Sequence, residues 1–417
     1  MSHARPFPSL LLLRNASCFP TQCINCAACS GFAKESFTRA NHNNYHVVYK
    51  QPETVDEINH ARAALAACPV AAIRIETLAE RRHGASTPEE KKAVQDSWSE
   101  EDEALVKKLS IRPTRHEEED VDDGIEKGRP FPRPFLEDKT IGDVFWVGHH
   151  NEASFGAIPY LLKTRRGKTL SRTSEEGVGK EIWIMVDTPR HSTSAVEDII
   201  QLTGPKGPDY LLLTHVDDTA DHQKWADVFP GLKRIFHAGD LGRFNWIGDH
   251  ALEDVEILLP KVEGDRTSLV AYSIDGEPLP ADWLTSTSVE DYPVVVIHTP
   301  GHSPGSISLY KRRDYSNEKD TASPGILFSG DTYAYTTRNG GYMTGFPKYG
   351  HDLMQQAETV AKLMQLDWEV VAPGHGGARD YRYLFDMVER KALQEEDMKA
   401  AIEELRGSKS RTTKWSS

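Results

Sequence analysis

The chain has 417 residues, which is long enough for two domains, with 38% hydrophobic and 27% charged residues. Its net charge of -14 argues against a general affinity for nucleic acid or for an anionic membrane surface. No apolar run approaches the roughly 18 residues that a membrane span needs. We therefore expect a soluble protein that acts on a small molecule, with neither nucleic acid nor membrane among its partners.

The segment before the first cysteine motif is basic and rich in serine. It carries Arg5 and Arg14, and no acidic residue occurs before Glu35. This composition is typical of organelle transit peptides, although an ordinary frayed terminus would look the same. We assign residues 1–13 to a tail and expect an intracellular protein, with the plastid stroma as one location.

All five cysteines lie within the first 68 positions, which is unlike a secreted disulfide framework. Cys23, Cys26 and Cys29 form C-x2-C-x2-C, and Cys68 is followed at once by a proline. Thiolates at every third position on a tight loop can face one centre, and a distant Cys-Pro can close an iron-sulfur cube. A four-cysteine zinc knot is the alternative, but zinc knots usually pair C-x2-C with C-x2-C.

Residues 14–82 resemble the small bacterial-type ferredoxins. The segments are QCINCAACSGFAKESF and ARAALAACPVAAIRI, with a short strand expected around Tyr45 to Tyr49 and an alanine-rich helix before the Cys-Pro. The resemblance implies an α+β domain with one [4Fe-4S] cluster on Cys23, Cys26, Cys29 and Cys68. Cys18 lies outside this pattern.

Residues 83–139 change to charged and proline-rich sequence, with an acidic run at Glu117 to Asp123. We interpret them as a linker, of which the first part could form an exposed helix. An acidic face for a basic redox partner is an alternative role for these charges. Residues 391–417 are expected to form a helix that frays into a tail.

Residues 140–390 alternate strand and helix patterns, which predicts two sheets packed face to face with helices outside. Strand-like runs are DVFWVG, AIPYLLK, EIWIMVDT, DYLLLTH, RIFHA, VVVIHTPGH, SISLYKR, ILFSGDT and WEVVAPGHG, and helix patterns are SAVEDIIQL and LMQQAETVAKLMQL. Five strand ends finish in side chains that can bind a metal: Asp187, His215 with its acidic neighbours, His302, Asp331 and His375. Repetition at successive strand ends predicts a shared metal site at one sheet edge.

This motif series resembles that of the metallo-β-lactamase superfamily, in which Asp, HxHxDH, His, Asp and His follow one another. The resemblance implies an αβ/βα sandwich in which Asp187 orders the loop beneath the site. It further implies a first metal on His215 and His302, a second on Asp221, His222 and His375, and Asp331 bridging the two.

The second motif departs from the family pattern, because HxHxDH reads HVDDTADH here. Asp217 or Asp218 must then replace an imidazole at the first metal, and carboxylates favour harder cations than zinc, such as iron or manganese. Loss of the first site, with a single metal on Asp221, His222, Asp331 and His375, is the alternative. Further candidates for the pocket or its hydrogen bonds are His149, His150, His237 and Asp240.

Three functions are compatible with these features. The leading hypothesis is a metallohydrolase with one or two zinc or iron ions, in which Asp221 or Asp218 orients a metal-bound water that attacks an ester or thioester. The runner-up is an iron-dependent oxidoreductase of oxygen or persulfide chemistry that receives electrons from the cluster, with a redox protein as partner. The third is a non-enzymatic electron carrier with a degenerate metal domain.

Overall fold

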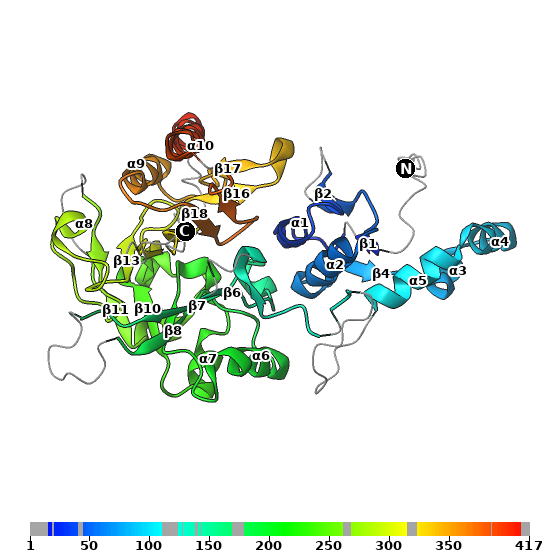
Figure 1. The fold of residues 1–417 in the computed structure, drawn as a ribbon, viewed down its shortest axis with the longest axis horizontal. Helices are drawn as coiled ribbons and strands as arrows, with labels where there is room; N and C mark the ends of the chain where they lie inside the picture. Colours follow the sequence, from blue (N-terminus) through cyan, green and yellow to red (C-terminus); the bar gives the residue numbers. More distant parts are fainter. Residues whose placement is uncertain are drawn as a thin grey trace. The chain divides into compact units, whose positions relative to one another are not determined.

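A computed structural model describes residues 16–18, 21–40, 45–110, 124–126, 128–137, 141, 143–168, 179–261, 268–314, 323–384 and 386–409. The described residues fall into two compact units (Figure 1). The first comprises those up to Asn25 and those from Cys29 to Pro130, and the second comprises Cys26–Ala28 and those from Phe131 onward. The tail at 1–13 and the acidic run at 117–123 lie outside the described residues. Within the described residues, no helix is both long and apolar enough to span a membrane.

The first unit is a small α+β fold. Its strands pair antiparallel in two ribbons, β1 (Ala16–Cys18) with β4 (Ile73–Ile75) and β2 (Phe37–Arg39) with β3 (His46–Val48). Its first two helices are α1 (Ala28–Phe32) and α2 (Val55–Ala67). A capping box begins α2, since Thr54 Oγ1 accepts from Glu57 N–H while the Glu57 carboxylate accepts from Thr54 N–H. The predicted short strand and alanine-rich helix are therefore present.

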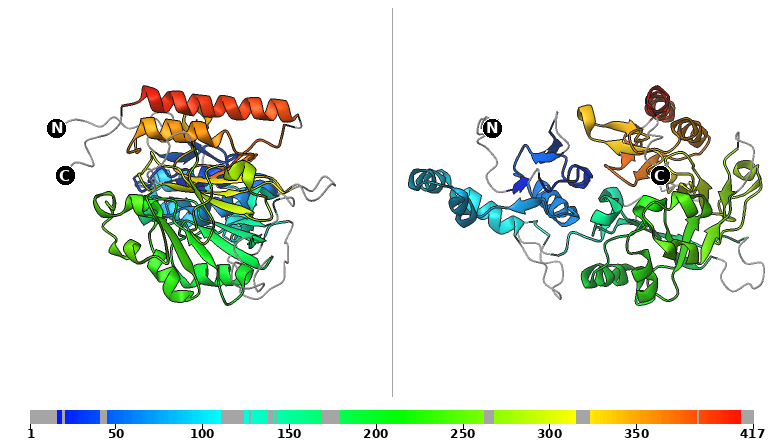
Figure 2. Two further views of the ribbon diagram at one scale, coloured as in Figure 1. Left: turned by 90° about the vertical axis from the view of Figure 1, so that its left-hand side faces the viewer. Right: turned by 180° about the vertical axis from the view of Figure 1, so that it is seen from behind.

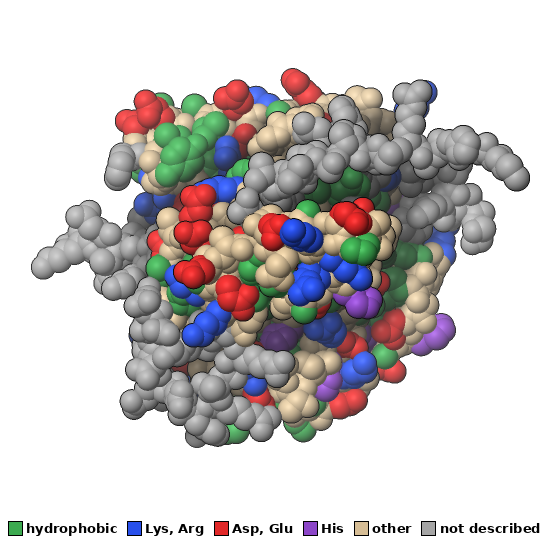
Figure 3. Space-filling view, turned by 90° about the vertical axis from the view of Figure 1, so that its right-hand side faces the viewer, with side chains coloured by type: hydrophobic (Ala, Val, Ile, Leu, Met, Phe, Trp, Pro, Cys, Tyr) green, Lys and Arg blue, Asp and Glu red, His purple; other side chains and the backbone are tan. Residues whose placement is uncertain are grey.

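The described residues of this region, 78–110 and 124–126, are more ordered than the linker expected from the sequence. They form three helices: α3 (Leu78–Gly84), α4 (Pro88–Ser97) and α5 (Glu100–Leu109). Leu109 and Ile125 pack with Ile58 of α2, and the Asn59 side chain bonds the backbone of Gly124 at 3.2 Å. The described part of this region thus belongs to the first unit, and its first part is helical, as the sequence indicated. On the face shown in Figure 3, acidic and basic side chains are interspersed.

The second unit is a sandwich of two mixed sheets. The first runs in the order β11-β10-β9-β8-β7-β6-β5 and the second in the order β12-β13-β14-β15-β18-β19. The strands of the first sheet are β5 (Arg133–Pro134), β6 (Val144–Trp146), β7 (Tyr160–Arg165), β8 (Glu181–Val186), β9 (Tyr210–Leu212), β10 (Lys233–His237) and β11 (Ile257–Leu259). Those of the second are β12 (Ala271–Tyr272), β13 (Val294–His298), β14 (Ile307–Lys311), β15 (Ile326–Gly330), β18 (Val370–Pro373) and β19 (Arg379–Asp380). A hairpin of β16 (Ala334–Thr336) and β17 (Tyr342–Thr344) follows β15.

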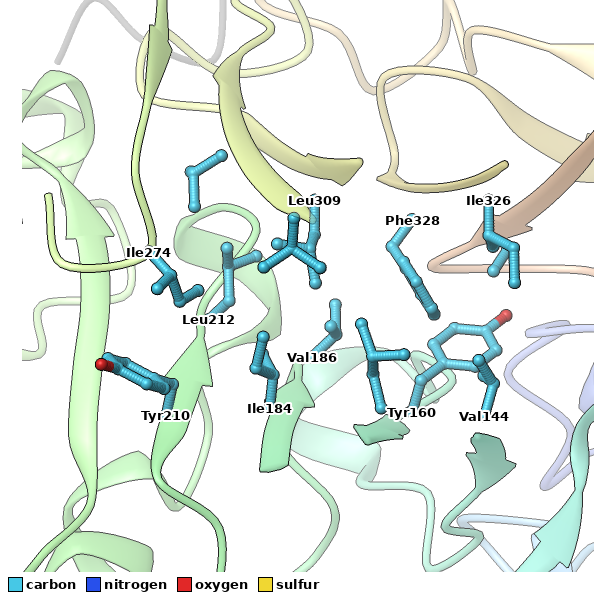
Figure 4. Close-up of a cluster of buried hydrophobic side chains, with 14 of the residues drawn as sticks. Val144, Tyr160, Ile184, Val186, Tyr210, Leu212, Ile274, Leu309, Ile326 and Phe328 are labelled. Atoms are coloured by element: carbon cyan, nitrogen blue, oxygen red, sulfur yellow. The ribbon is translucent and has the colours of Figure 1, made fainter. Parts of the chain in front are cut away.

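Helices cover the two outer faces of the sandwich. On the first sheet lie α6 (Thr193–Thr203) and α7 (His222–Val228), and on the second lie α8 (Trp283–Ser286), α9 (Leu353–Leu363) and α10 (Met387–Gly407) (Figures 1 and 2). Three apolar layers result, of which the central one lies between the sheets. Figure 4 shows side chains of this layer from both sheets pointing toward one another, including Tyr160, Leu212 and Phe328. The expected αβ/βα sandwich is confirmed.

Both ends of this unit differ from the sequence-based boundaries. Arg133 of β5 pairs with Trp146 of β6, so the first sheet begins before residue 140. At the other end, Met398, Ile402 and Leu405 of α10 are buried in the outer apolar layer of the second sheet. The predicted C-terminal helix is therefore present and packs on the domain as an integral layer, while the tail expected after it, residues 410–417, lies outside the described residues.

Candidate metal centre

Five side chains of the site follow the ends of strands in the two sheets. Asp187 follows β8, His215 follows β9, His302 follows β13, Asp331 follows β15 and His375 follows β18. Parallel pairing of β8 with β9 and of β15 with β18 brings the carboxyl ends of these strands to the same edges of the two sheets. The sandwich then places the two edges together, which is how residues far apart in sequence come to lie close to one another.

The first group consists of His215, Asp217 and His302, whose ligand atoms all lie within 4.8 Å of one another. Asp217 Oδ2 lies 3.7 Å from His215 Nε2 and 3.9 Å from His302 Nε2. Donor atoms at such separations can share one ion that lies about 2.0–2.2 Å from each of them. Two imidazoles and a carboxylate therefore surround one potential cation position.

The second group consists of Asp218, Asp331 and His375, again within 4.8 Å of one another. Asp331 Oδ2 is 3.7 Å from His375 Nε2 and also 3.7 Å from His302 Nε2 of the first group. One carboxylate oxygen thus lies between the two groups, as a bridging ligand would.

Buried polar atoms without hydrogen bonds indicate that both groups fit cations. Among the described residues, His215 Nε2, both carboxylate oxygens of Asp218 and Asp331 Oδ1 are buried without a partner. Each such atom costs about 1–3 kcal/mol when left unsatisfied. Burial and the neighbouring Asp187 and Asp331 raise the pKa of Asp218 well above its ordinary value, as expected for carboxylates crowded together with no cation between them.

His215 of the first group is placed in the form that binds metals. Burial, followed by the neighbouring His302, lowers the pKa of His215 to about 4, so the imidazole is neutral. Thr214 Oγ1 donates to Asp187 Oδ2 at 3.0 Å and lies 3.1 Å from His215 Nδ1. Because the hydroxyl proton goes to Asp187, His215 Nδ1 carries the hydrogen and Nε2 keeps its lone pair toward the group. Asp187 therefore orders the site through Thr214.

Gly374 is placed where a side chain would collide with the second group. A Cβ at this position would lie 2.9 Å from Asp331 Oδ1 and 3.3 Å from Asp218 Oδ2. The missing side chain leaves room for both carboxylates to turn inward. The sequence PGHG marked this turn, but only the packing shows which atoms need the space.

The structure does not bring Asp221 and His222, which were expected at the second metal, into either group. Asp221 accepts hydrogen bonds from Asn151 Nδ2, from His191 N–H and from Lys224 Nζ. The place expected for it is taken by Asp218. The sequence drew attention to Asp221 because Asp-His matches the end of HxHxDH, but the two additional residues turn that pair away from the site.

Both ring nitrogens of His222 are occupied. The Arg234 guanidinium can only donate, so His222 Nδ1, 3.1 Å from Arg234 Nη1, must accept. His222 Nε2 then carries the hydrogen and donates to Asp249 Oδ2 at 3.1 Å. No lone pair of this ring remains for a metal.

Of the additional candidates, His149 and His237 have partners that belong to neither metal group. His149 Nε2 lies 2.7 Å from Asp198 Oδ2, and His237 stacks on His298 with ring centroids 4.0 Å apart. His150 is buried with Nδ1 3.1 Å from the Gly156 carbonyl oxygen.

Asp240 supports the loops that carry the first group. Its carboxylate accepts hydrogen bonds from Val216 N–H, from Ser303 Oγ at 2.7 Å and from Gly305 N–H. Val216 lies between His215 and Asp217, and Ser303 follows His302. The buried Asp240 therefore ties both ligand-bearing loops to the end of β10.

The cysteine region of the first unit also fits its expected group. Cys29 is buried in α1, while Cys23, Cys26 and Cys68 are half-buried. Cys23 Sγ accepts from Asn25 N–H at 3.4 Å, and Cys68 Sγ accepts from Ala72 N–H at 3.2 Å.

The backbone of these cysteine loops curls around the thiols. Asn25, Ala27 and Ala71 all have positive φ, at 63°, 65° and 50°. Such curled segments with inward N–H groups are typical of anion and iron-sulfur sites.

Comparison with known protein families agrees with this description of the first unit. Residues 20–75 match the family model described as the 4Fe-4S single cluster domain of ferredoxin I. The ferredoxin resemblance is confirmed. No curated protein sequence matches the chain.

Comparison with solved structures finds metallo-β-lactamase superfamily proteins. One from Sulfolobus tokodaii is 16% identical, covering 60% of this chain and 93% of its own, with a TM-score of 0.30. A family member from Thermus thermophilus is 17% identical, covering 60% and 73%, with a TM-score of 0.33. A diflavin flavoprotein fragment from a Nostoc species is 13% identical, covering 60% and 84%, with a TM-score of 0.33. At these identities, no reaction is carried over from these proteins to this chain.

Proposed function

We propose that the second unit is a two-metal oxidoreductase, loaded with iron, that reduces a small oxidant such as dioxygen or a persulfide. The observation that carries this proposal is the ligand set. Asp217, Asp218 and Asp331 contribute oxygen, three histidines contribute nitrogen, and the sequence has no cysteine after Cys68. With Asp218 in place of Asp221 and His222, the second group has the same two carboxylates but one imidazole fewer than the sequence predicted, which favours iron or manganese over zinc.

The charge of the site supports the same conclusion. With two divalent cations bound, Asp217, Asp218 and Asp331 would be ionised, and the site would carry a small net positive charge in a buried place. A site of that charge would stabilise an oxidant as it gains electrons. Two iron ions, when bound, supply reversible one-electron storage at each of two positions. Asp331, whose Oδ2 faces both groups, would help to hold both ions.

The first unit would supply the electrons. Its match to a single-cluster ferredoxin domain supports a [4Fe-4S] centre, whose ordinary chemistry is the transfer of one electron at a time. Hydrolysis requires no such donor. The electrons would enter the first unit from a redox protein partner.

Hydrolysis of an ester or thioester is the second candidate, because two neighbouring cation positions that share a carboxylate also suit water activation. Asp218 would then accept the proton of the attacking water. Zinc in place of iron would favour this reaction.

Metal content and electron flow test the proposal together. Anaerobically purified protein is expected to contain about six irons per chain, about four in the cluster and about two in the second unit, and no zinc. The cluster is first reduced, and the protein is then mixed with dioxygen or a persulfide. The electron paramagnetic resonance signal of the reduced cluster should disappear faster than in His375→Ala, which retains the cluster but loses metal from the second group. About four irons with zinc, or equal reoxidation rates in both proteins, would overturn the proposal.

A further inference from the structure

The two oxygens of Asp217 have different partners. Oδ2 faces His215 Nε2 at 3.7 Å and His302 Nε2 at 3.9 Å, where a cation of the first group would lie. Oδ1 accepts a hydrogen bond from Trp246 Nε1 at 2.5 Å. Asp217 itself is partly buried. One oxygen is thus directed at the cation position and the other is bound by an indole.

This division limits how Asp217 can bind a metal. A free carboxylate can chelate one ion with both oxygens or turn to a neighbouring ion. An indole N–H is a donor only, so Trp246 can bind Oδ1 but cannot itself replace a ligand. Asp217 would then offer one donor atom, as the imidazole of the family pattern would, with its second heteroatom in a hydrogen bond.

The loop that carries Trp246 is anchored at its far end. Asp249 Oδ2 lies 3.1 Å from His222 Nε2, and Asn245 Nδ2 donates to the Asp249 carbonyl oxygen at 2.7 Å. His222 is itself held by Arg234. The indole of Trp246 packs on the apolar layer outside the first sheet. His222, expected to be a ligand, instead helps to fix the loop that holds Asp217.

We propose that Trp246 is a positioning residue that restricts Asp217 to one-oxygen ligation and so leaves a coordination position of the first cation open for a small anionic or diatomic ligand. The inference rests on the proposed function, because it requires a cation on His215, Asp217 and His302. Removal of the indole N–H would release Oδ1, which would chelate the ion and fill the position that the small ligand needs.

Cobalt(II) and azide test this inference on the full-length protein with its cluster oxidised. Cobalt K-edge absorption reports the ligand number without interference from the iron of the cluster. In Trp246→Phe, cobalt should still bind, its pre-edge intensity should fall as the ligand number rises, and azide affinity measured by calorimetry should fall about tenfold or more. Trp368→Phe is the matched control, because Trp368 Nε1 donates to the Leu363 carbonyl oxygen in the outer layer of the other sheet. It should behave as the wild type.

The same substitution in an Asp217→His variant separates an effect on ligation from poor folding of Trp246→Phe. In Asp217→His, the imidazole has a single donor toward the ion, so adding Trp246→Phe should no longer weaken azide binding. Equal azide affinity and equal pre-edge intensity in wild type and Trp246→Phe would refute the positioning role alone. The same azide loss in the Asp217→His background as in the wild-type background would also refute it. Failure of the wild type to bind cobalt in the second unit would instead refute the proposed function.

Discussion

Gly374→Ala is the sharpest test of the second metal group. The added methyl carbon would lie 2.9 Å from Asp331 Oδ1 and 3.3 Å from Asp218 Oδ2. The first distance is well inside van der Waals contact, so Asp331 must move by about half an ångström, more than the roughly 0.2 Å that metal–ligand distances tolerate. Gly374 does not have positive φ, so the backbone itself accepts an alanine.

The expected cost falls mainly on metal binding. Displacement of ligands or their supports typically weakens metal affinity about 10–100-fold, which corresponds to about 1.4–2.7 kcal/mol. Overpacking adds a loss of unfolding free energy of about 1–3 kcal/mol. Equilibrium dialysis of the metal-free protein against manganese(II), with the bound ion counted by electron paramagnetic resonance, would measure the affinity of each group.

Gly231→Ala provides the matched control, since no heavy atom lies within 4 Å of the Cβ position at Gly231 and its φ is not positive. It should bind both ions with the affinity of the wild type. The explanation based on crowding would fail if Gly374→Ala also bound two ions with unchanged affinity. Thermal unfolding of both variants would separate loss of a ligand from loss of the fold.

Three other predictions follow from the same coordinates. Asp218→Asn should abolish the second ion by removing a carboxylate ligand, whereas Asp221→Asn should retain both ions; the reverse pattern in metal analysis would restore the original assignment. Cys68→Ser should remove the visible absorption of the cluster and leave the metal content of the second unit unchanged, and loss of both would contradict the division into two units. Burial lowers the pKa of Lys311 from 10.5 to about 8 in the folded state. Between pH 8 and 10.5 the unfolded state therefore binds more protons than the folded state, so stability should rise with pH in this range. Lys311→Met should remove that rise and increase the unfolding free energy at pH 7 by about 1–3 kcal/mol in denaturant titrations, even though the contacts with Ser323 and Pro324 are lost.

Some parts of the fold could have been predicted from local signals that we interpreted otherwise. Helices α3, α4 and α5 each begin with a capping box, formed by Thr77 with Glu80, Thr87 with Glu90, and Ser99 with Asp102. The high charge and the prolines of residues 83–139 are typical of a linker, and they indicate the opposite of these capping boxes. By contrast, α10 has few buried residues along its length, so its sequence gives little indication that one face docks on the sandwich.

The sequence by itself determined the chemistry that is available and the strand ends where it occurs. Cysteine spacing predicted the cluster, and alternating apolar runs predicted two sheets with His215, His302, Asp331 and His375 at their ends, because strand periodicity and turn-forming residues are local properties. Tertiary structure alone decided which acids of HVDDTADH face the pocket. The short helix at Val216–Asp218 turns Asp217 and Asp218 inward, while Asp221 and His222 are held by Lys224, Arg234 and Asp249 from other segments. The direction in which a side chain points depends on such long-range partners, which cannot be predicted from the spacing of residues within a motif.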